Sequence, residues 1–125
     1  MKINIKATGI ELTPAIASYV NKKISSIEKY LTKDADIVAQ VEVGKSTKHH
    51  KAGNIFRAEV HITGPGLDFY AVAEEADLYA AIDIVKDEIV RTATQLKDKR
   101  KTLARRGAEM IKNMMKGITN SFKKR

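Results

Sequence analysis

The sequence contains no cysteine, and this absence removes several kinds of chemistry at once. Without a thiol the chain forms no disulfide, has no thiolate nucleophile and builds no cysteine-based zinc site. Residues 1–8 also lack the long apolar run of a secretory signal, and no apolar segment reaches the ~18 residues that a membrane span needs. The length of 125 residues, with 43% hydrophobic and 30% charged residues, predicts one small globular domain with an appendage, and the lack of cysteine is compatible with a reducing cytoplasm.

Acidic residues are scarce at the end of the chain. Residues 97–125 contain 11 Lys and Arg against two Asp and Glu, a net charge of +9, whereas residues 1–96 have 12 against 13, a net charge of −1. Such asymmetry predicts a polyanionic partner, and nucleic acid ranks ahead of a membrane surface. A tail that only improves solubility is the alternative.

A catalytic or cofactor-binding constellation is also missing. The segment GKST at 44–47 ends like a phosphate-binding loop, but Ala39 stands where that motif needs its first glycine. The adjacent His49 and His50 have no third ligand nearby, and His61 is expected to point outward from a strand. No spaced nucleophile, base and acid can be assembled. We expect no enzyme, no metal, no cofactor and no small-molecule substrate.

The most regular pattern lies in residues 77–101. Apolar residues recur there at helical spacing, with Asp77 as the N-terminal cap: Leu78, Ala81, Ile82, Val85, Ile89, Ala93 and Leu96. The acids Asp83, Asp87 and Glu88 are expected on the solvated side. Lys99 and Arg100 then occupy positions that should face the core, so we expect the helix to leave the globular body near Leu96.

Apolar residues also recur at regular spacing in the rest of residues 1–73. Residues 1–7, 36–43, 56–63 and 67–73 show the two-residue period of half-buried strands, and Thr13-Pro14 opens a helix whose apolar stripe continues to Leu31. The predicted fold is therefore α+β, in the order β-α-β-β-β-α, with both helices on one face of a four-stranded sheet. We predict a domain at 1–101 and a basic amphipathic tail at 102–125.

The sequence favours nucleic-acid binding through phosphate contacts over binding through base stacking. A sheet that stacks bases needs exposed aromatic side chains, and the outward strand positions offer only Tyr70. Lysines on helices suit phosphate contacts, which position a protein without reading sequence. The first predicted helix has Lys22, Lys29 and Lys33 along one side, and the last has Lys86, Lys97 and Lys101. Two lysine-edged helices can grip a folded RNA by its shape.

Four segments, taken with the element order, resemble one known family. They are AEEADLYAAID at 73–83, QLKDKRK at 95–101, YVNKKISSIEKYL at 19–31 and FRAEVHI at 56–62. Over residues 1–101 the chain resembles the short form of the ribosome hibernation-promoting factors, a family that includes protein Y, the ribosome-associated inhibitor, and that was also described as sigma-54 modulation protein.

The resemblance implies a fold like the double-stranded-RNA-binding domain. It implies binding to 16S-type rRNA of the small ribosomal subunit, in the intersubunit channel for mRNA and tRNA, with inhibition of translation and stabilisation of idle ribosomes. The rRNA contacts it implies fall on basic residues of the two helices, and Ser26 stands where relatives can carry a lysine. Six cations fall within residues 97–106, and this dense group adds Arg105 and Arg106 to the contacts. The expected rRNA-binding set is therefore Lys22, Lys23, Lys29, Lys86, Lys97, Lys99, Arg100, Lys101, Arg105 and Arg106.

The last 24 residues are too few for the second domain of long family members. Six apolar residues line one helical face there: Met110, Ile111, Met114, Met115, Ile118 and Phe122. Gly107 and Gly117 weaken a free helix by about 1 kcal/mol each relative to alanine. RNA or a ribosomal protein, a second copy, and a membrane surface remain open as occupants of this face. We prefer the first, expect no membrane, and expect a monomer off the ribosome.

Two rival functions remain. One is a general double-stranded-RNA-binding module that acts outside the ribosome. The other is a non-RNA regulator whose basic tail docks on an acidic protein or an anionic membrane. Co-sedimentation with ribosomes separates all three.

Overall fold

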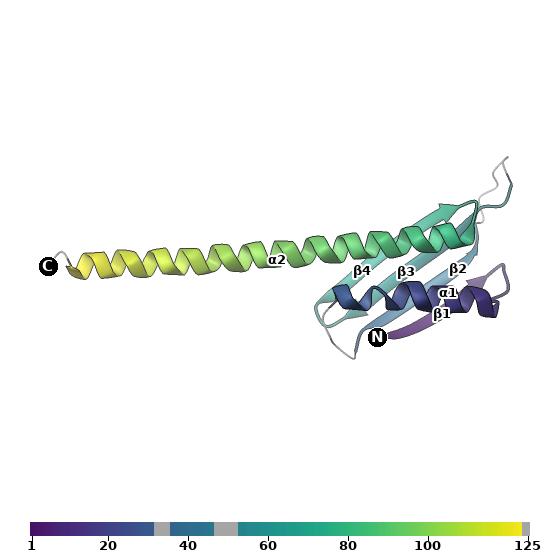
Figure 1. Ribbon diagram of the computed structural model, residues 1–125, viewed down its shortest axis with the longest axis horizontal. Helices are drawn as coiled ribbons and strands as arrows, with labels where there is room; N and C mark the ends of the chain where they lie inside the picture. The colour runs from purple at the N-terminus through teal and green to yellow at the C-terminus, as the bar shows by residue number, and fades with distance from the viewer. Residues whose placement is uncertain (32–35, 47–52, 124–125) are drawn as a thin grey trace. The chain divides into compact units, whose positions relative to one another are not determined.

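The computed structural model describes residues 1–31, 36–46 and 53–123. The chain divides into two compact units, Met1–Ala93 and Thr94–Arg125. The elements follow the order β1 (Lys2–Thr8), α1 (Pro14–Ser25), the short 3₁₀ helix η1 (Glu28–Tyr30), β2 (Val38–Lys45), β3 (Phe56–Gly64), β4 (Leu67–Glu75) and α2 (Leu78–Lys123) (Figure 1). The predicted α+β order is confirmed, whereas Lys33, Thr47, His49 and His50 lie outside the described residues.

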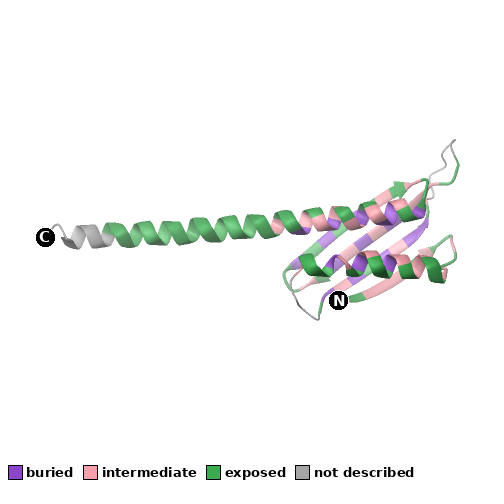
Figure 2. Cartoon of the chain, viewed as in Figure 1, coloured by how far each residue is buried: buried purple, intermediate pink, exposed green. Residues whose placement is uncertain are grey.

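The four strands form one mixed sheet in the order β1-β2-β3-β4. β1 runs parallel to β2, and the other neighbours are antiparallel. In this register Val41 pairs with Ile5 and Val60, and Val60 pairs with Ala71, so the apolar side chains of all four strands share a face. Helix α1 and the N-terminal part of α2 cover that face, and buried residues run along their sheet-facing sides (Figures 1 and 2).

Helix α1 begins as its sequence predicts. The backbone N–H of Ile16 donates to the Thr13 hydroxyl at 3.2 Å, and Pro14 occupies the first turn. Val20 and Ile24 are fully buried. These residues fix the helix against the sheet.

The end of α1 differs from the prediction of one helix to Leu31. The α-helix stops at Ser25, and the chain continues with bonds to the third residue back, because Ile27 N–H donates to Ile24 O at 3.0 Å. The Ser26 hydroxyl donates to Lys23 O at 2.5 Å and so competes for a helical carbonyl. Ile27 nevertheless stays fully buried. Apolar spacing alone did not reveal this change of winding.

Helix α2 carries the largest share of the helical core. Tyr79 N–H donates to the Asp77 carboxylate at 3.1 Å, as the predicted cap requires. Ile82, Val85 and Ile89 are at most 1% exposed. Among the residues whose burial is described, Ala93 is the last buried one, and it also closes the first compact unit. The predicted domain boundary at residue 101 stays a prediction.

Candidate nucleic-acid interface

Tyr19 and Asp83 connect the two helices of the first unit. The Tyr19 hydroxyl donates to Asp83 Oδ1 at 2.6 Å, and Lys23 Nζ lies 3.4 Å from the same oxygen. The Tyr19 ring packs edge-on against Tyr79, with centroids 4.8 Å apart, and Lys23 Nζ lies 5.5 Å from the Tyr19 centroid. The hydrogen bond to Asp83, with burial as the second cause, raises the pKa of Tyr19 to about 12. The network therefore orients Lys23, one of the predicted rRNA contacts.

The structure adds a contact at Asp83 that the sequence did not predict. The side chain is 44% exposed, in keeping with the solvated side we expected, and it also accepts a hydrogen bond and an ion pair from α1. The only signal in the sequence is that Tyr19 and Lys23, like Tyr79 and Asp83, are four residues apart and so share a helix face. Nothing in that spacing says that the two pairs meet.

The other predicted cations of this unit, Lys22, Lys29 and Lys86, are held by fewer partners than Lys23. Lys22 is exposed in the last turn of α1. Lys29 lies in η1, with its Nζ 5.1 Å from the Tyr30 ring centroid. Lys86 Nζ is 3.4 Å from the carboxylate of its neighbour Asp87. These ammonium groups keep most of their donors for an external anion.

The second unit contains the densest group of cations. Residues 97–106 are helical and exposed, and six of the ten are basic: Lys97, Lys99, Arg100, Lys101, Arg105 and Arg106. Asp98 is the one acid among them. Lys97, Lys101 and Arg105 are four residues apart and so share one flank, where phosphates of a polyanion can be contacted in succession.

The open face of the sheet shows little that suits base stacking. Tyr70 is 55% exposed, and its ring meets His61 edge-on at 6.0 Å between centroids. His61 Nε2 lies 2.7 Å from Asp68. His61 thus points outward and bonds a neighbouring strand, as the strand pattern predicts.

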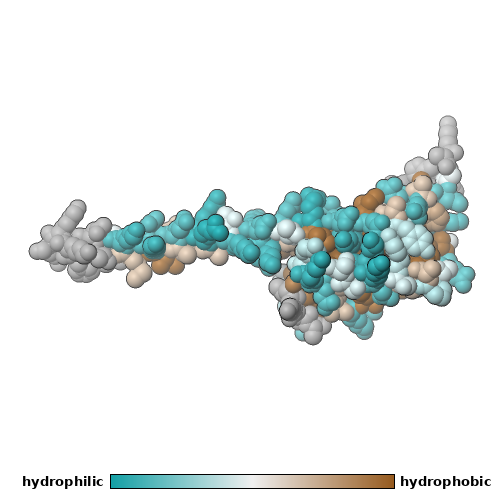
Figure 3. Space-filling view, in the orientation of Figure 1, coloured by the Kyte–Doolittle hydropathy of each residue, from teal (hydrophilic) through white to brown (hydrophobic). Residues whose placement is uncertain are grey.

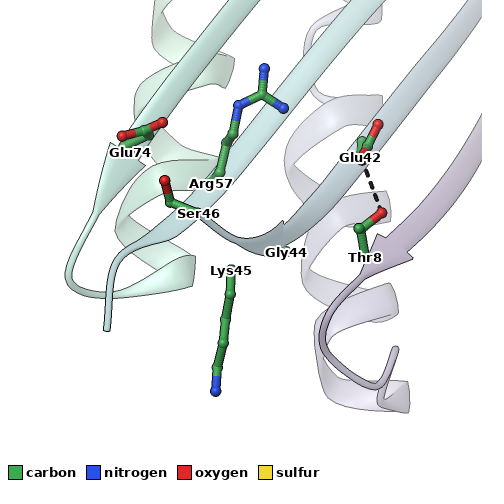
Figure 4. Close-up of a pocket in the computed structure, with 7 residues that line it drawn as sticks. All are labelled: Thr8, Glu42, Gly44, Lys45, Ser46, Arg57 and Glu74. Carbon is green, nitrogen blue, oxygen red and sulfur yellow. Dashed lines mark hydrogen bonds between the residues drawn. The ribbon is translucent and has the colours of Figure 1, made fainter. Parts of the chain in front are cut away.

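A polar hollow of about 410 Å³ opens at one end of this face (Figure 4). The Thr8 hydroxyl donates to Glu42 at 3.0 Å, and Arg57 pairs with Glu59 at 2.7 Å, so these charged groups already have partners. Gly44 lines the hollow, but a Cβ there would lie 2.2 Å from Thr8 O. The glycine of the GKST segment therefore serves the close approach of β1 and β2.

Among residues 1–31, 36–46 and 53–123, no helix is long and apolar enough to cross a membrane. The same residues contain no cluster of three or more His, Cys, Asp or Glu that suits a metal ion. Charged and hydrophilic side chains instead dominate the visible surface of α2 (Figure 3).

The fold and surface define a class: an α+β domain with a four-stranded sheet, covered on one face by two helices that carry lysines. Residues 3–101 match the family described as Sigma 54 modulation protein / S30EA ribosomal protein. The chain belongs to this family.

The relatives agree with that assignment. The ribosome hibernation promoting factor of Klebsiella oxytoca is 34% identical over 101 residues, which are 81% of this chain and 98% of the relative. The factor of the same name from Escherichia coli K12 is 33% identical, with the same coverage. The solved N-terminal domain of Thermus thermophilus Protein Y is 30% identical, with a TM-score of 0.64 over 77% of this chain and 99% of that domain.

Proposed function

We propose that this protein is a ribosome hibernation factor. It binds the small ribosomal subunit in the intersubunit channel for mRNA and tRNA, inhibits translation and stabilises idle ribosomes. The proposal rests on family membership over residues 3–101, because relatives named hibernation promoting factors match almost from end to end. Because ribosomes work in the cytoplasm, we propose that the protein acts there.

The proposed contact surface consists of exposed or half-exposed cations, which neutralise rRNA phosphates and fix the protein by shape and charge. From the first unit it includes Lys22, Lys23, Lys29 and Lys86. From the second it includes Lys97, Lys99, Arg100, Lys101, Arg105 and Arg106. Occupation of the channel would exclude mRNA and tRNA sterically. The protein therefore needs no turnover chemistry, and we propose that it is not an enzyme.

Sucrose-gradient co-sedimentation with purified ribosomes and separated subunits tests the proposal. We expect the protein to sediment with the small subunit and with whole ribosomes, and to lower translation of a reporter mRNA as it saturates them. Competition by tRNA and mRNA should release it, since the sites overlap. Translation and tRNA binding that stay unchanged at saturation would refute the proposal.

The two rival functions give different results in the same experiment. A general double-stranded-RNA module would bind an unrelated RNA duplex as tightly as the small subunit. A regulator that docks through its basic tail would bind neither. An unrelated duplex of matched length is therefore the essential control.

A further inference from the structure

Residues 103–123 repeat every seven residues. The three repeats are LARRGAE, MIKNMMK and GITNSFK. In each repeat the first, second, fifth and sixth positions are apolar or small, and the third, fourth and seventh are polar or charged. A seven-residue apolar period is the pattern by which one helix packs along another.

The repeat produces an exposed apolar stripe on a helical segment. Its described large side chains are all more than half exposed: Leu103 (56%), Met110 (65%), Ile111 (62%), Met114 (65%) and Met115 (65%). At 3.6 residues per turn the four apolar positions of each repeat fall on one side of the helix. In the part of this segment before residue 118, Figure 3 shows hydrophobic side chains along one edge, with hydrophilic ones beside them. Single exposed apolar residues are ordinary, but a continuous stripe marks an interaction surface.

The charges lie away from this stripe. Arg105 and Lys112 take the third position of their repeats, and Lys116 takes the seventh, on the side opposite the apolar positions. RNA phosphates are attracted to that cationic side and leave the stripe uncovered. A lipid surface imposes no seven-residue register, whereas a partner helix requires one. Ala104, Gly107 and Ala108 add little apolar area for lipid, but they allow a helix backbone to come close.

We propose that residues 103–123 pair with the same segment of a second copy of this chain. A second copy carries the identical period, so apolar positions meet apolar positions and the cations of both copies face solvent. The polar side of each helix then stays available to a polyanion. This proposal goes beyond the ribosome-binding function and differs from the expectation of a monomer off the ribosome.

Salt separates this pairing from RNA binding. The net charge of +9 on residues 97–125 repels a second copy at low salt. Screening shortens the Debye length from about 10 Å at 0.1 M to about 3 Å at 1 M, so pairing should strengthen as salt rises. Binding to RNA phosphates should weaken over the same range.

Sedimentation equilibrium of the full chain at ~0.1 M and ~1 M salt tests the proposal. We expect a monomer–dimer equilibrium that shifts toward the dimer at high salt. The stripe variant Ile111→Gln/Met114→Gln should weaken dimerisation by about tenfold or more. The control variant Lys112→Gln/Lys116→Gln, on the opposite side, should dimerise at least as well as the parent.

Three outcomes would overturn the proposal. They are a parent chain that is monomeric at both salt concentrations, a stripe variant that dimerises like the parent, and a monomer that binds phosphatidylglycerol vesicles through the stripe. Circular dichroism checks that each variant keeps the folded first unit, which contains none of the changed residues. Loss of ribosome binding with retained dimerisation would refute the proposed function alone.

Discussion

The hydroxyl of Tyr19 and the carboxylate of Asp83 form a 2.6 Å hydrogen bond that joins α1 to α2 across 64 residues of sequence. The same carboxylate oxygen lies 3.4 Å from Lys23 Nζ. One acid thus holds the helices in register and positions a cation of the proposed rRNA surface. Its negative charge also offsets part of the positive charge of the proposed rRNA surface.

Asp83→Ala should destabilise the first unit by about 1–2 kcal/mol, because Tyr19 loses a charged acceptor. The ion pair adds little, since Lys23 and Asp83 are both partly exposed. Asp87→Ala is the matched control: its side chain is 75% exposed and pairs with the adjacent Lys86. Both changes gain the same helix propensity. Urea denaturation should show a clear loss for the first variant and less than about 0.5 kcal/mol for the second.

The raised pKa of Tyr19 predicts a loss of stability at alkaline pH. The neutral phenol donates to Asp83, so folding favours the protonated form and raises its pKa from 10.0 to about 12. This contribution is fully present below pH 10 and disappears as the pH rises toward about 12. The measurement is the difference in unfolding free energy between the parent and Tyr19→Phe as a function of pH. A difference that stays constant from pH 9 to about 12 would contradict the assignment.

Replacement of six cations by Gln at positions 97, 99, 100, 101, 105 and 106 should weaken ribosome binding and leave thermal stability nearly unchanged. If four of these residues neutralise phosphates, the parent should lose affinity with a slope of log K against log salt of roughly −3 to −4. The variant should have a flatter slope. Undiminished affinity with the parent's slope would assign the contacts to the lysines of the first unit alone.

Two double variants, each with the same change in net charge, separate specific phosphate contacts from general charge attraction. Lys97→Gln/Lys101→Gln and Lys2→Gln/Lys6→Gln each remove two exposed cations, the second pair from the open side of β1. Only the first pair should reduce the salt slope, by about one for each lost phosphate contact. Equal effects from the two pairs would indicate attraction by net charge, without specific contacts.

Ile82→Ala and Ile89→Ala should each cost roughly 2–5 kcal/mol in unfolding free energy, because each leaves a cavity in the core. Both side chains are at most 1% exposed. Ile84→Ala, on the same helix but 43% exposed, is the control and should cost well under half as much. Similar losses at all three positions would contradict the described face of α2.

Two glycines should respond to alanine in opposite ways. A Cβ at Gly44 would meet Thr8 O at 2.2 Å, so Gly44→Ala should destabilise the sheet by about 1–3 kcal/mol. A Cβ at Gly107 would meet no described atom within 4 Å, so Gly107→Ala should favour the helix by about 1 kcal/mol. Denaturation and helical circular dichroism, respectively, report these changes. If Gly44→Ala left the unfolding free energy unchanged and instead abolished nucleotide binding, the GKST segment would be a phosphate-binding loop after all.

The regular spacing of apolar residues along the sequence determined most of the fold. Alternation in the strands and the stripe through Ile82, Val85 and Ile89 predicted the elements, their order and the shared core, because burial of one apolar face constrains local sequence strongly. Exposed cations such as Lys97 and Lys101 were also predictable as a surface. They require no partner from the rest of the chain to remain in solvent.

Only the tertiary structure decided which polar side chains meet. The sequence gives no reason for Tyr19 to find Asp83, because that bond depends on the distance and rotation of two helices set by the sheet beneath them. The same holds for Gly44, whose lack of a side chain matters only because β1 brings Thr8 O against it. The structure alone also showed the tighter winding after Ser25, which ends the α-helix and keeps Ile27 buried. Hydrophobic burial depends on area and so leaves a periodic record in the sequence, whereas a hydrogen bond depends on the positions of two particular atoms and leaves none.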